Sequence, residues 1–136
     1  MAEKLILEVV TPQKAVVRET VETVVAPGSE GEFGALKGHT TFLTSLKVGT
    51  LRFKDDNGKQ RALFVNGGFA EVLPDKVTIL AESAEAQQDI DIVRAQAAKE
   101  RAEQRLANRA AGIDLLRAEL ALRRALHRLK VAQHGK

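Results

Sequence analysis

The chain has 136 residues, no cysteine and a formal net charge of +3. Without cysteine it cannot form disulfides, thiolate nucleophiles or zinc–cysteine sites, and no apolar run approaches the roughly 18 residues of a membrane-spanning helix. The start, MAEKLILEVV, has no apolar signal-peptide core, so we expect neither a leader nor a transmembrane anchor.

Composition divides the chain near residue 87. All five phenylalanines and all three prolines lie before residue 75, and eight of the ten glycines lie before residue 70. Residues 1–87 carry 10 Lys/Arg and 12 Asp/Glu, whereas residues 88–136 carry 11 and 6. We therefore expect two domains, a neutral-to-acidic one at 1–86 and a basic one at 87–136.

The first domain is expected to be a β-sandwich of about ten short strands. Its apolar segments are rich in Val, Ile, Leu, Thr and Phe, and several alternate with polar residues. Asp-Asp-Asn-Gly at 55–58 predicts a hairpin, because Asn-Gly accepts the positive φ of a type I′ turn. The dipeptides at 27–28, 67–68 and 74–75 (Pro-Gly, Gly-Gly and Pro-Asp) are typical of turns. The expected strands include 5–10, 20–26, 41–48, 50–54, 61–66, 69–73 and 76–82.

The second domain is expected to be an antiparallel two-helix hairpin, so the fold is α+β in sequence order. Strong helix formers dominate residues 91–109 and 113–132, and Gly112 falls between them, where a helix C-terminus favours positive φ. Asp89 or Asp91 can cap the first helix. Asp114 is expected in the first turn of the second helix, where a negative charge is favourable.

The predicted helix–helix seam is rich in alanine. A buried Ala has about three fewer methyl or methylene groups than Leu, so each such site contributes roughly 2 kcal/mol less at about 0.8 kcal/mol per group. We therefore expect the two helices to pack weakly on each other and on the sandwich, so that the hairpin can open and close. The seam residues are Leu115, Ala118, Leu122, Ala125, Leu129 and Ala132 on the second helix, and Ala95, Ala98, Ala102 and Leu106 on the first.

Two stretches of the first domain resemble the epsilon-subunit family of bacterial F-type ATP synthases. Residues 27–49 read PGSEGEFGALKGHTTFLTSLKVG, with the family's Pro-Gly turn, Gly-x-x-Gly stretch, Gly-His pair and strand ending in Gly. Residues 65–82 read VNGGFAEVLPDKVTILAE, similar to the family's Gly-Gly-Phe hairpin and following strand. Leu36-Lys37 departs from the family's Leu-Pro, a local loop change. The resemblance continues through the helices.

The resemblance implies a non-catalytic rotor subunit of a proton-translocating complex. It implies that the sandwich docks on the gamma subunit and on the c-subunit ring, and that the extended hairpin reaches the alpha/beta catalytic head. It also implies a peripheral position on the cytoplasmic face of a bacterial plasma membrane, held there through the complex.

The segment Ile90-Asp91-Ile92-Val93-Arg94-Ala95 matches the family's nucleotide-binding motif, Ile/Leu-Asp-x-x-Arg-Ala. Three further arginines match the family's supporting positions. The resemblance thus implies ATP as a regulatory ligand that is not hydrolysed, with any Mg²⁺ requirement left open. The implied ATP-binding residues are Ile90, Asp91, Arg94, Ala95, Arg101, Arg124 and Arg128.

Helical spacing brings the same four arginines together. Arg94 and Arg101 share a face of the first helix, and Arg124 and Arg128 share a face of the second. Antiparallel pairing around residue 111 places Arg94 opposite Arg128. Arginine binds phosphate bidentately and stays charged. Four such side chains repel one another unless an anion binds between them.

Two other readings of these residues remain, and two further classes of function are disfavoured. Asp91 can be an N-cap alone, and the arginines can bind acidic segments of a partner protein, which would make the chain a purely structural coupling subunit. Nucleic-acid binding is disfavoured because the helical half has no aromatic residue for base stacking. An enzyme is disfavoured too, since the sequence has no Gly-x-x-x-x-Gly-Lys-Ser/Thr loop, and the three histidines form no metal motif.

Overall fold

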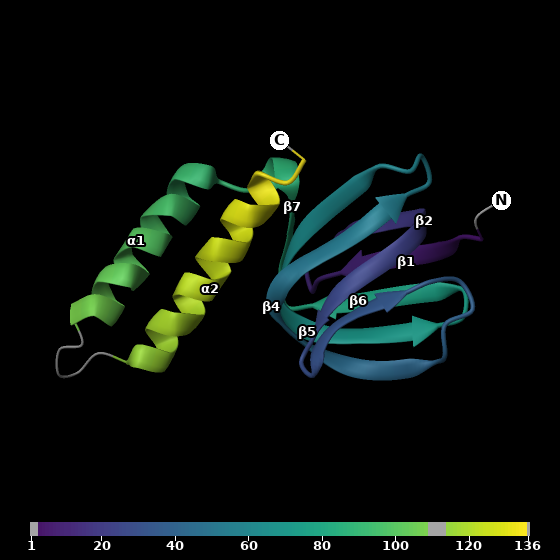
Figure 1. Cartoon of the computed structure of the whole chain (residues 1–136), viewed down its shortest axis with the longest axis horizontal. Helices are drawn as coiled ribbons and strands as arrows, with labels where there is room; N and C mark the ends of the chain where they lie inside the picture. Colours follow the sequence, from purple (N-terminus) through teal and green to yellow (C-terminus); the bar gives the residue numbers. More distant parts are fainter. Residues whose placement is uncertain (1–2, 109–113, 136) are drawn as a thin grey trace.

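A computed structural model describes residues 3–108 and 114–135 of the chain. They form a β-sandwich followed by two antiparallel helices that stand beside it (Figure 1). The β-sandwich and the helical hairpin expected from the sequence are therefore confirmed. The elements are β1 (Leu5–Val10), β2 (Ala15–Gly28), β3 (Gly31–Ala35), β4 (Phe42–Asp55), β5 (Gln60–Leu73), β6 (Lys76–Ala81), β7 (Ala84–Ala86), the 3-10 turn η1 (Gln87–Asp89), α1 (Ile92–Asn108) and α2 (Leu115–Ala132).

The strands wrap around a single core. They follow the order β1-β6-β5-β4-β2-β3, and β1 also pairs with β2, which closes the sheet on itself. The β1–β6 pairing is parallel and the other pairings are antiparallel. In β1, Leu5, Leu7 and Val9 are buried, so every second side chain enters the core, as the two-residue period of a strand requires.

The expectation of about ten short strands was wrong in number and length. The described residues form seven strands, of which β2, β4 and β5 each have 14 residues. The segments expected at 41–48 and 50–54 are both parts of β4, and those at 61–66 and 69–73 are both parts of β5. Each of these long strands pairs with more than one neighbour along its length.

Glycine explains why the strands bend and continue. The expected turn at Gly67-Gly68 lies inside β5, where both residues have positive φ, 72° and 115°. Gly68 approaches β6 so closely that a Cβ would lie 2.0 Å from Leu80 O. Glycine in a strand marks such bends and close backbone approaches. In the same way, β4 runs on past Gly49 instead of ending there.

Two of the remaining predicted turns are confirmed and one is displaced. The β4–β5 hairpin lies at residues 55–58 as expected, but Asp55 N donates to Lys59 O at 2.9 Å, so the loop has three residues and not the two of a type I′ turn. Asp55 Oδ1 accepts the backbone N–H groups of Asn57 and Lys59. Pro74-Asp75 joins β5 to β6, whereas Pro27-Gly28 ends β2 and the turn follows at residues 29–30.

The helical hairpin is joined through small side chains. Ala95 and Ala102 of α1 and Ala118 and Ala125 of α2 are buried, which agrees with the predicted alanine seam. The seam leucines Leu115, Leu122 and Leu129 stay partly or well exposed. Asp91 Oδ1 accepts Arg94 N–H at 3.0 Å. Asp114 is the N-cap of α2, one position before the first turn in which it was expected. Gly112 and the expected helix limits at 109 and 113 lie outside the described residues.

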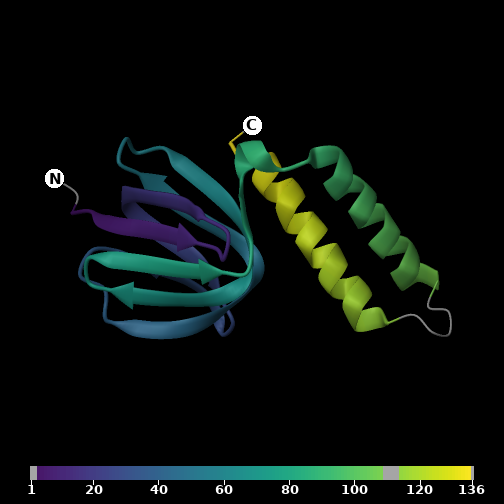
Figure 2. The same cartoon turned by 180° about the vertical axis from the view of Figure 1, so that it is seen from behind.

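Of the two helices formed by the described residues, α2 is the one that packs extensively against the sandwich. Val131 and Ala132 at its C-terminal end join Ala62, Phe64 and Ile90 in a second buried cluster. Helix α1 packs on α2 and lies on the side away from the strands, as the front and back views show (Figures 1 and 2). None of the helices formed by the described residues is long and apolar enough to cross a membrane.

Candidate anion-binding site in the helical hairpin

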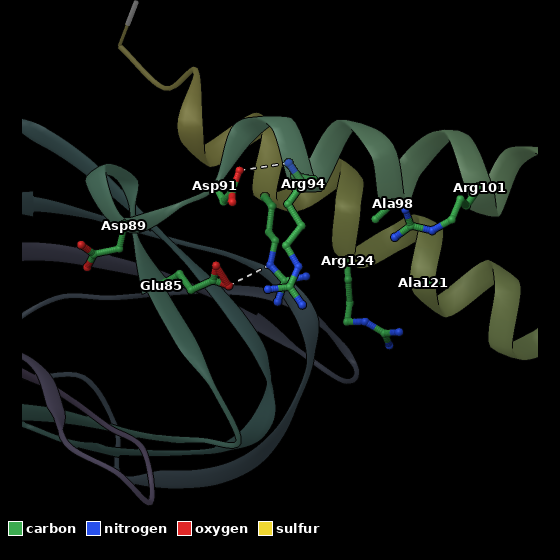
Figure 3. A pocket seen from close by; sticks show the side chains of 10 residues that line it. Glu85, Asp89, Asp91, Arg94, Ala98, Arg101, Ala121 and Arg124 are labelled. Atoms are coloured by element: carbon green, nitrogen blue, oxygen red, sulfur yellow. Dashed lines mark hydrogen bonds and ion pairs between the residues drawn. The ribbon is translucent and has the colours of Figure 1, made fainter.

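A cavity of about 550 Å³ lies between the two helices next to β7 (Figure 3). Helices α1 and α2 form its walls, and the β7–η1 segment forms the end nearest the sandwich. The cavity exists only while both helices are folded against each other. Its lining residues are Glu85, Asp89, Asp91, Arg94, Ala95, Ala98, Arg101, Ala121, Arg124 and Arg128.

Four arginines face this one space. Arg94 and Arg101 come from α1, and Arg124 and Arg128 come from α2. Each pair is spaced by one or two helical turns, so both members lie on the same face of their helix. The structure thus brings together the four arginines that the sequence placed on facing sides of the hairpin.

Arg128 already has two partners on the sandwich. Its Nε donates to Glu85 Oε2 at 2.7 Å, and its guanidinium carbon lies 4.5 Å from the centroid of the Phe64 ring. Phe64 and Glu85 are direct neighbours across the β5–β7 pairing, so one side chain of α2 contacts two adjacent strands. Within residues 3–108 and 114–135, Arg94, Arg101 and Arg124 have no carboxylate at salt-bridge distance.

Charge is distributed unevenly along the cavity. Glu85 and Asp91 lie near the sandwich end, and Arg101 and Arg124 lie further along the helices (Figure 3). The Asp89 carboxylate points away from the arginines in the same view. The sandwich end therefore holds carboxylates together with the Arg128 guanidinium that Glu85 binds, and the far end holds Arg101 and Arg124, which can donate hydrogen bonds to an anion.

The other predicted site residues divide into two groups. Asp91 and Ala95 line the cavity, and Asp91 also caps α1. Ile90 does not line it. Its side chain is 8% exposed and packs in the second cluster with Phe64, so it fixes the start of the hairpin on the sandwich.

The sequence did not indicate Glu85 and Asp89 as lining residues. Glu85 reaches the cavity because β7 pairs with β5, a non-local contact that leaves no local pattern. Ala98 belongs to the predicted seam, and Ala121 could have been found from the same helical spacing, since it lies three residues before Arg124. No group of three or more His, Asp or Glu suited to a metal ion occurs in the part of the chain that the structure describes.

The fold and the site define a class of protein: a β-sandwich that carries a C-terminal helical hairpin with an arginine-lined cavity between its helices. Two family descriptions match the chain over these same regions. The ATP synthase delta/epsilon chain β-sandwich domain matches residues 4–87, and the delta/epsilon chain long α-helix domain matches residues 88–133.

Full-length relatives agree with these matches. The ATP synthase epsilon chain of Desulforapulum autotrophicum is 65% identical over 133 residues, which are 98% of either chain. The epsilon chain of Syntrophobacter fumaroxidans is 55% identical, again over 98% of both chains. The chain therefore belongs to the ATP synthase delta/epsilon family, as a non-catalytic subunit of the epsilon type.

Solved structures show the same architecture. A chain in the Euglena gracilis mitochondrial ATP synthase structure, which comprises OSCP, F1 and c-ring, superposes with a TM-score of 0.81 at 26% identity, covering 96% of this chain and 82% of that one. A chain in the Tetrahymena thermophila mitochondrial ATP synthase central stalk and c-ring structure gives a TM-score of 0.54 at 16% identity, over 96% and 94% of the two chains. The second likeness supports the fold alone.

Proposed function

We propose that the chain is a rotor subunit of the central stalk of a proton-translocating ATP synthase and regulates that enzyme through its hairpin. The sandwich docks on the gamma subunit and the c-subunit ring and couples proton flow to ATP synthesis. The extended hairpin contacts the alpha/beta head and inhibits ATP hydrolysis. Such a subunit lies on the cytoplasmic face of the bacterial plasma membrane and is held there by its partners. Family membership and the likeness to a chain of the Euglena assembly support this placement.

The observation that carries the regulatory part is the cavity with four arginines from two helices. Its volume of about 550 Å³ falls within the roughly 300–1,000 Å³ of small-molecule sites. Arginine guanidinium groups match phosphate oxygens in geometry and charge. The carboxylates at the other end can accept hydrogen bonds from amino and hydroxyl groups. ATP carries both phosphates and such donors, so its chemistry suits the arginines and the carboxylates of this cavity.

The ligand would act by binding one state of the hairpin. Separating the helices divides Arg94 and Arg101 from Arg124 and Arg128, so only the folded state can use all four. A ligand at 100 times its dissociation constant stabilises that state by about 2.7 kcal/mol. The alanine seam holds the helices weakly, so this amount is enough to shift the population between folded and extended states.

Binding is tested by calorimetric titration of ATP into the whole chain, with GTP for comparison and with Mg²⁺ present and absent. We expect the wild-type chain to release heat on binding ATP, and we expect Arg94→Ala to abolish that heat. Arg105→Ala is the control and should leave it unchanged, because Arg105 is an exposed residue of α1 outside the cavity. Absence of heat up to millimolar ATP would reject the nucleotide site while leaving family membership intact.

Regulation is tested in the assembled complex. Truncation after Ala86 removes both helices and keeps every strand. We expect hydrolysis at low ATP to rise in the truncated complex because the inhibitory element is gone. Equal hydrolysis by the truncated and complete complexes would reject the inhibitory role.

A second function has one observation in its favour. Arg128 binds the Glu85 carboxylate within the chain, so the cluster can recognise acidic side chains. In that reading the chain is a structural coupling subunit whose hairpin binds acidic segments of its partners without sensing nucleotide. It predicts no ATP heat in either the wild type or Arg94→Ala.

A further inference from the structure

One polar contact joins α2 to the face of the sandwich beneath it. Thr50 Oγ1 of β4 and His127 Nδ1 of α2 lie 2.9 Å apart, at hydrogen-bond distance. Thr50 is buried, with 5% of its surface exposed, and His127 is half-buried. Since 77 positions separate the two residues, the contact exists only while the hairpin is docked.

The contact borders the apolar cluster that seats α2. His127 and Val131 are four residues apart and share a helix face, and Val131 is fully buried in that cluster. Val48, two residues before Thr50 on the same strand face, packs against the cluster as well. A change in the charge of the His127 ring therefore acts directly at the docked surface.

Cations surround this ring. Burial lowers the pKa of His127, and the charges of Lys130 and Arg123 on α2 and of Lys47 on β4 lower it further. Glu32 of β3 acts in the opposite direction and has the smallest effect of these groups.

Glu32 is a weak counter-charge because it is already engaged. Its carboxylate accepts a hydrogen bond from Arg52 Nη2 at 2.7 Å and forms an ion pair with that side chain. An imidazolium at position 127 would thus lie among three cations and one carboxylate held by another cation. In an undocked hairpin the same ring faces water and has lost the burial and the Lys47 charge.

We propose that His127 is a proton-sensitive latch, so that a proton bound to its ring releases the hairpin from the sandwich. The latch rests on the two-state hairpin of the proposed function and requires no nucleotide. It adds the proton as a second signal that favours the open state.

The direction follows from linkage. The docked state has the lower pKa, so it binds protons less readily than the open state. The free energy of docking is most favourable above the open-state pKa of His127, which is about 6.5 for an unperturbed histidine. It weakens as pH falls through that value and reaches a constant level below the docked pKa. One proton can change the opening constant by at most tenfold per unit of pH.

The experiment measures opening in the full-length chain by fluorescence energy transfer. The chain has no cysteine, so Glu71→Cys on β5 and Glu103→Cys on α1, both exposed, place one dye on each domain. We expect transfer to fall between pH 7.5 and 5.5, with an unchanged far-ultraviolet circular dichroism spectrum. In His127→Gln the pH dependence should be lost, whereas His134→Gln should keep it.

Three outcomes decide the matter. A pH response that disappears with His127→Gln and stays with His134→Gln supports the latch. A response equal in all three chains overturns it, and so does a flat response in the wild type. Thr50→Val provides a second variant, because it should weaken docking at every pH while leaving the pH dependence in place. Calorimetry with ATP at pH 8, where His127 is neutral, tests the nucleotide site separately.

Discussion

Arg128 of α2 donates from Nε to Glu85 Oε2 of β7 at 2.7 Å, and this pair joins the helical hairpin to the sandwich. The guanidinium also lies over the ring of Phe64, the cross-strand neighbour of Glu85. A phosphate that binds Arg128 would have to share it with Glu85. The same arginine therefore serves docking within the chain and the proposed ligand site.

Replacing Arg128 should open the hairpin. The Arg128 and Glu85 side chains are 31% and 28% exposed, so solvent screens the pair in part, and we expect Arg128→Ala to weaken docking by about 1–2 kcal/mol. That corresponds to an increase of about 5–30-fold in the opening constant, measurable with the dye pair at positions 71 and 103. Arg128→Lys should recover only part of the docking free energy that Arg128→Ala loses, because an ammonium cannot stack on the Phe64 ring as a guanidinium does. An opening constant for Arg128→Ala equal to that of Arg105→Ala would contradict this.

Filling the cavity should block ATP without changing any charge. Ala121→Leu adds three carbon atoms to a residue that lines the cavity, and we expect ATP affinity to fall by at least about tenfold, or 1.4 kcal/mol. Ala107→Leu is the matched control, because Ala107 is an exposed residue of α1 that does not line the cavity. Calorimetry measures both. Wild-type affinity in a folded Ala121→Leu chain would place the ligand elsewhere.

Asp91 can be tested as a cap and as a ligand group in one series. Asp91→Ala should destabilise the start of α1 by about 1 kcal/mol, and Asp91→Asn should not, since Asn caps as well as Asp. Hydrogen exchange of the amides of the first turn of α1 measures this. For ATP affinity we expect a loss in both variants, because both remove the carboxylate. If Asn restored stability and affinity alike, Asp91 would be a cap alone.

Gln87 should hold the C-terminal end of α2. Its Nε2 donates to Ala132 O at 3.1 Å and to His134 O at 2.8 Å. Ala132 is the last residue of α2, and the end of a helix leaves its carbonyl free. Gln87→Leu should therefore lower the free energy of local opening of the last turn of α2 by about 1 kcal/mol for each bond lost. Faster hydrogen exchange of the amides in that turn measures this loss. The neighbouring Gln88 is exposed, so Gln88→Leu should leave that exchange unchanged. Equal protection in the two variants would show that the bonds do not stabilise the helix end.

Gly68 should be sensitive to any side chain. A Cβ there would lie 2.0 Å from Leu80 O, and the residue has a φ of 115°. We expect Gly68→Ala to cost at least about 2 kcal/mol, which lowers the melting temperature of a domain of this size by roughly 8–16 °C. Gly34→Ala is the control, because its nearest neighbour, Val24 O, would be at 3.8 Å. Equal melting temperatures for the two variants would contradict the close approach.

Local patterns predicted the elements better than their limits. Alternation at residues 21–25 and 69–73 and helix-forming residues after 91 act within a few positions of the chain, so they could be found without knowledge of the rest. The bends were missed for the same reason. Whether Gly67-Gly68 turns the chain back or lets β5 continue depends on its pairing with β6, which a local pattern does not contain.

The division at residues 1–86 and 87–136 stays a prediction, as do the ATP-binding roles of Asp91 and the arginines. The placement of the four arginines around one cavity was predictable because two helices and an antiparallel turn fix which residues face each other. The ATP-binding role of Ile90 also stays a prediction. Its side chain is buried against Phe64, a contact that depends on how the hairpin docks and that the motif does not contain.

The sequence by itself determined the β-rich and helical halves, the alanine seam and the two arginine faces, because each follows from a periodicity of 2 or 3.6 residues along a single element. Only the tertiary structure decided that α2 and not α1 lies against the sandwich, that Glu85 holds Arg128, and that Thr50 meets His127. Those partners are 43 and 77 positions apart. Which of many distant side chains come together depends on how whole elements pack, and packing is a property of the complete core.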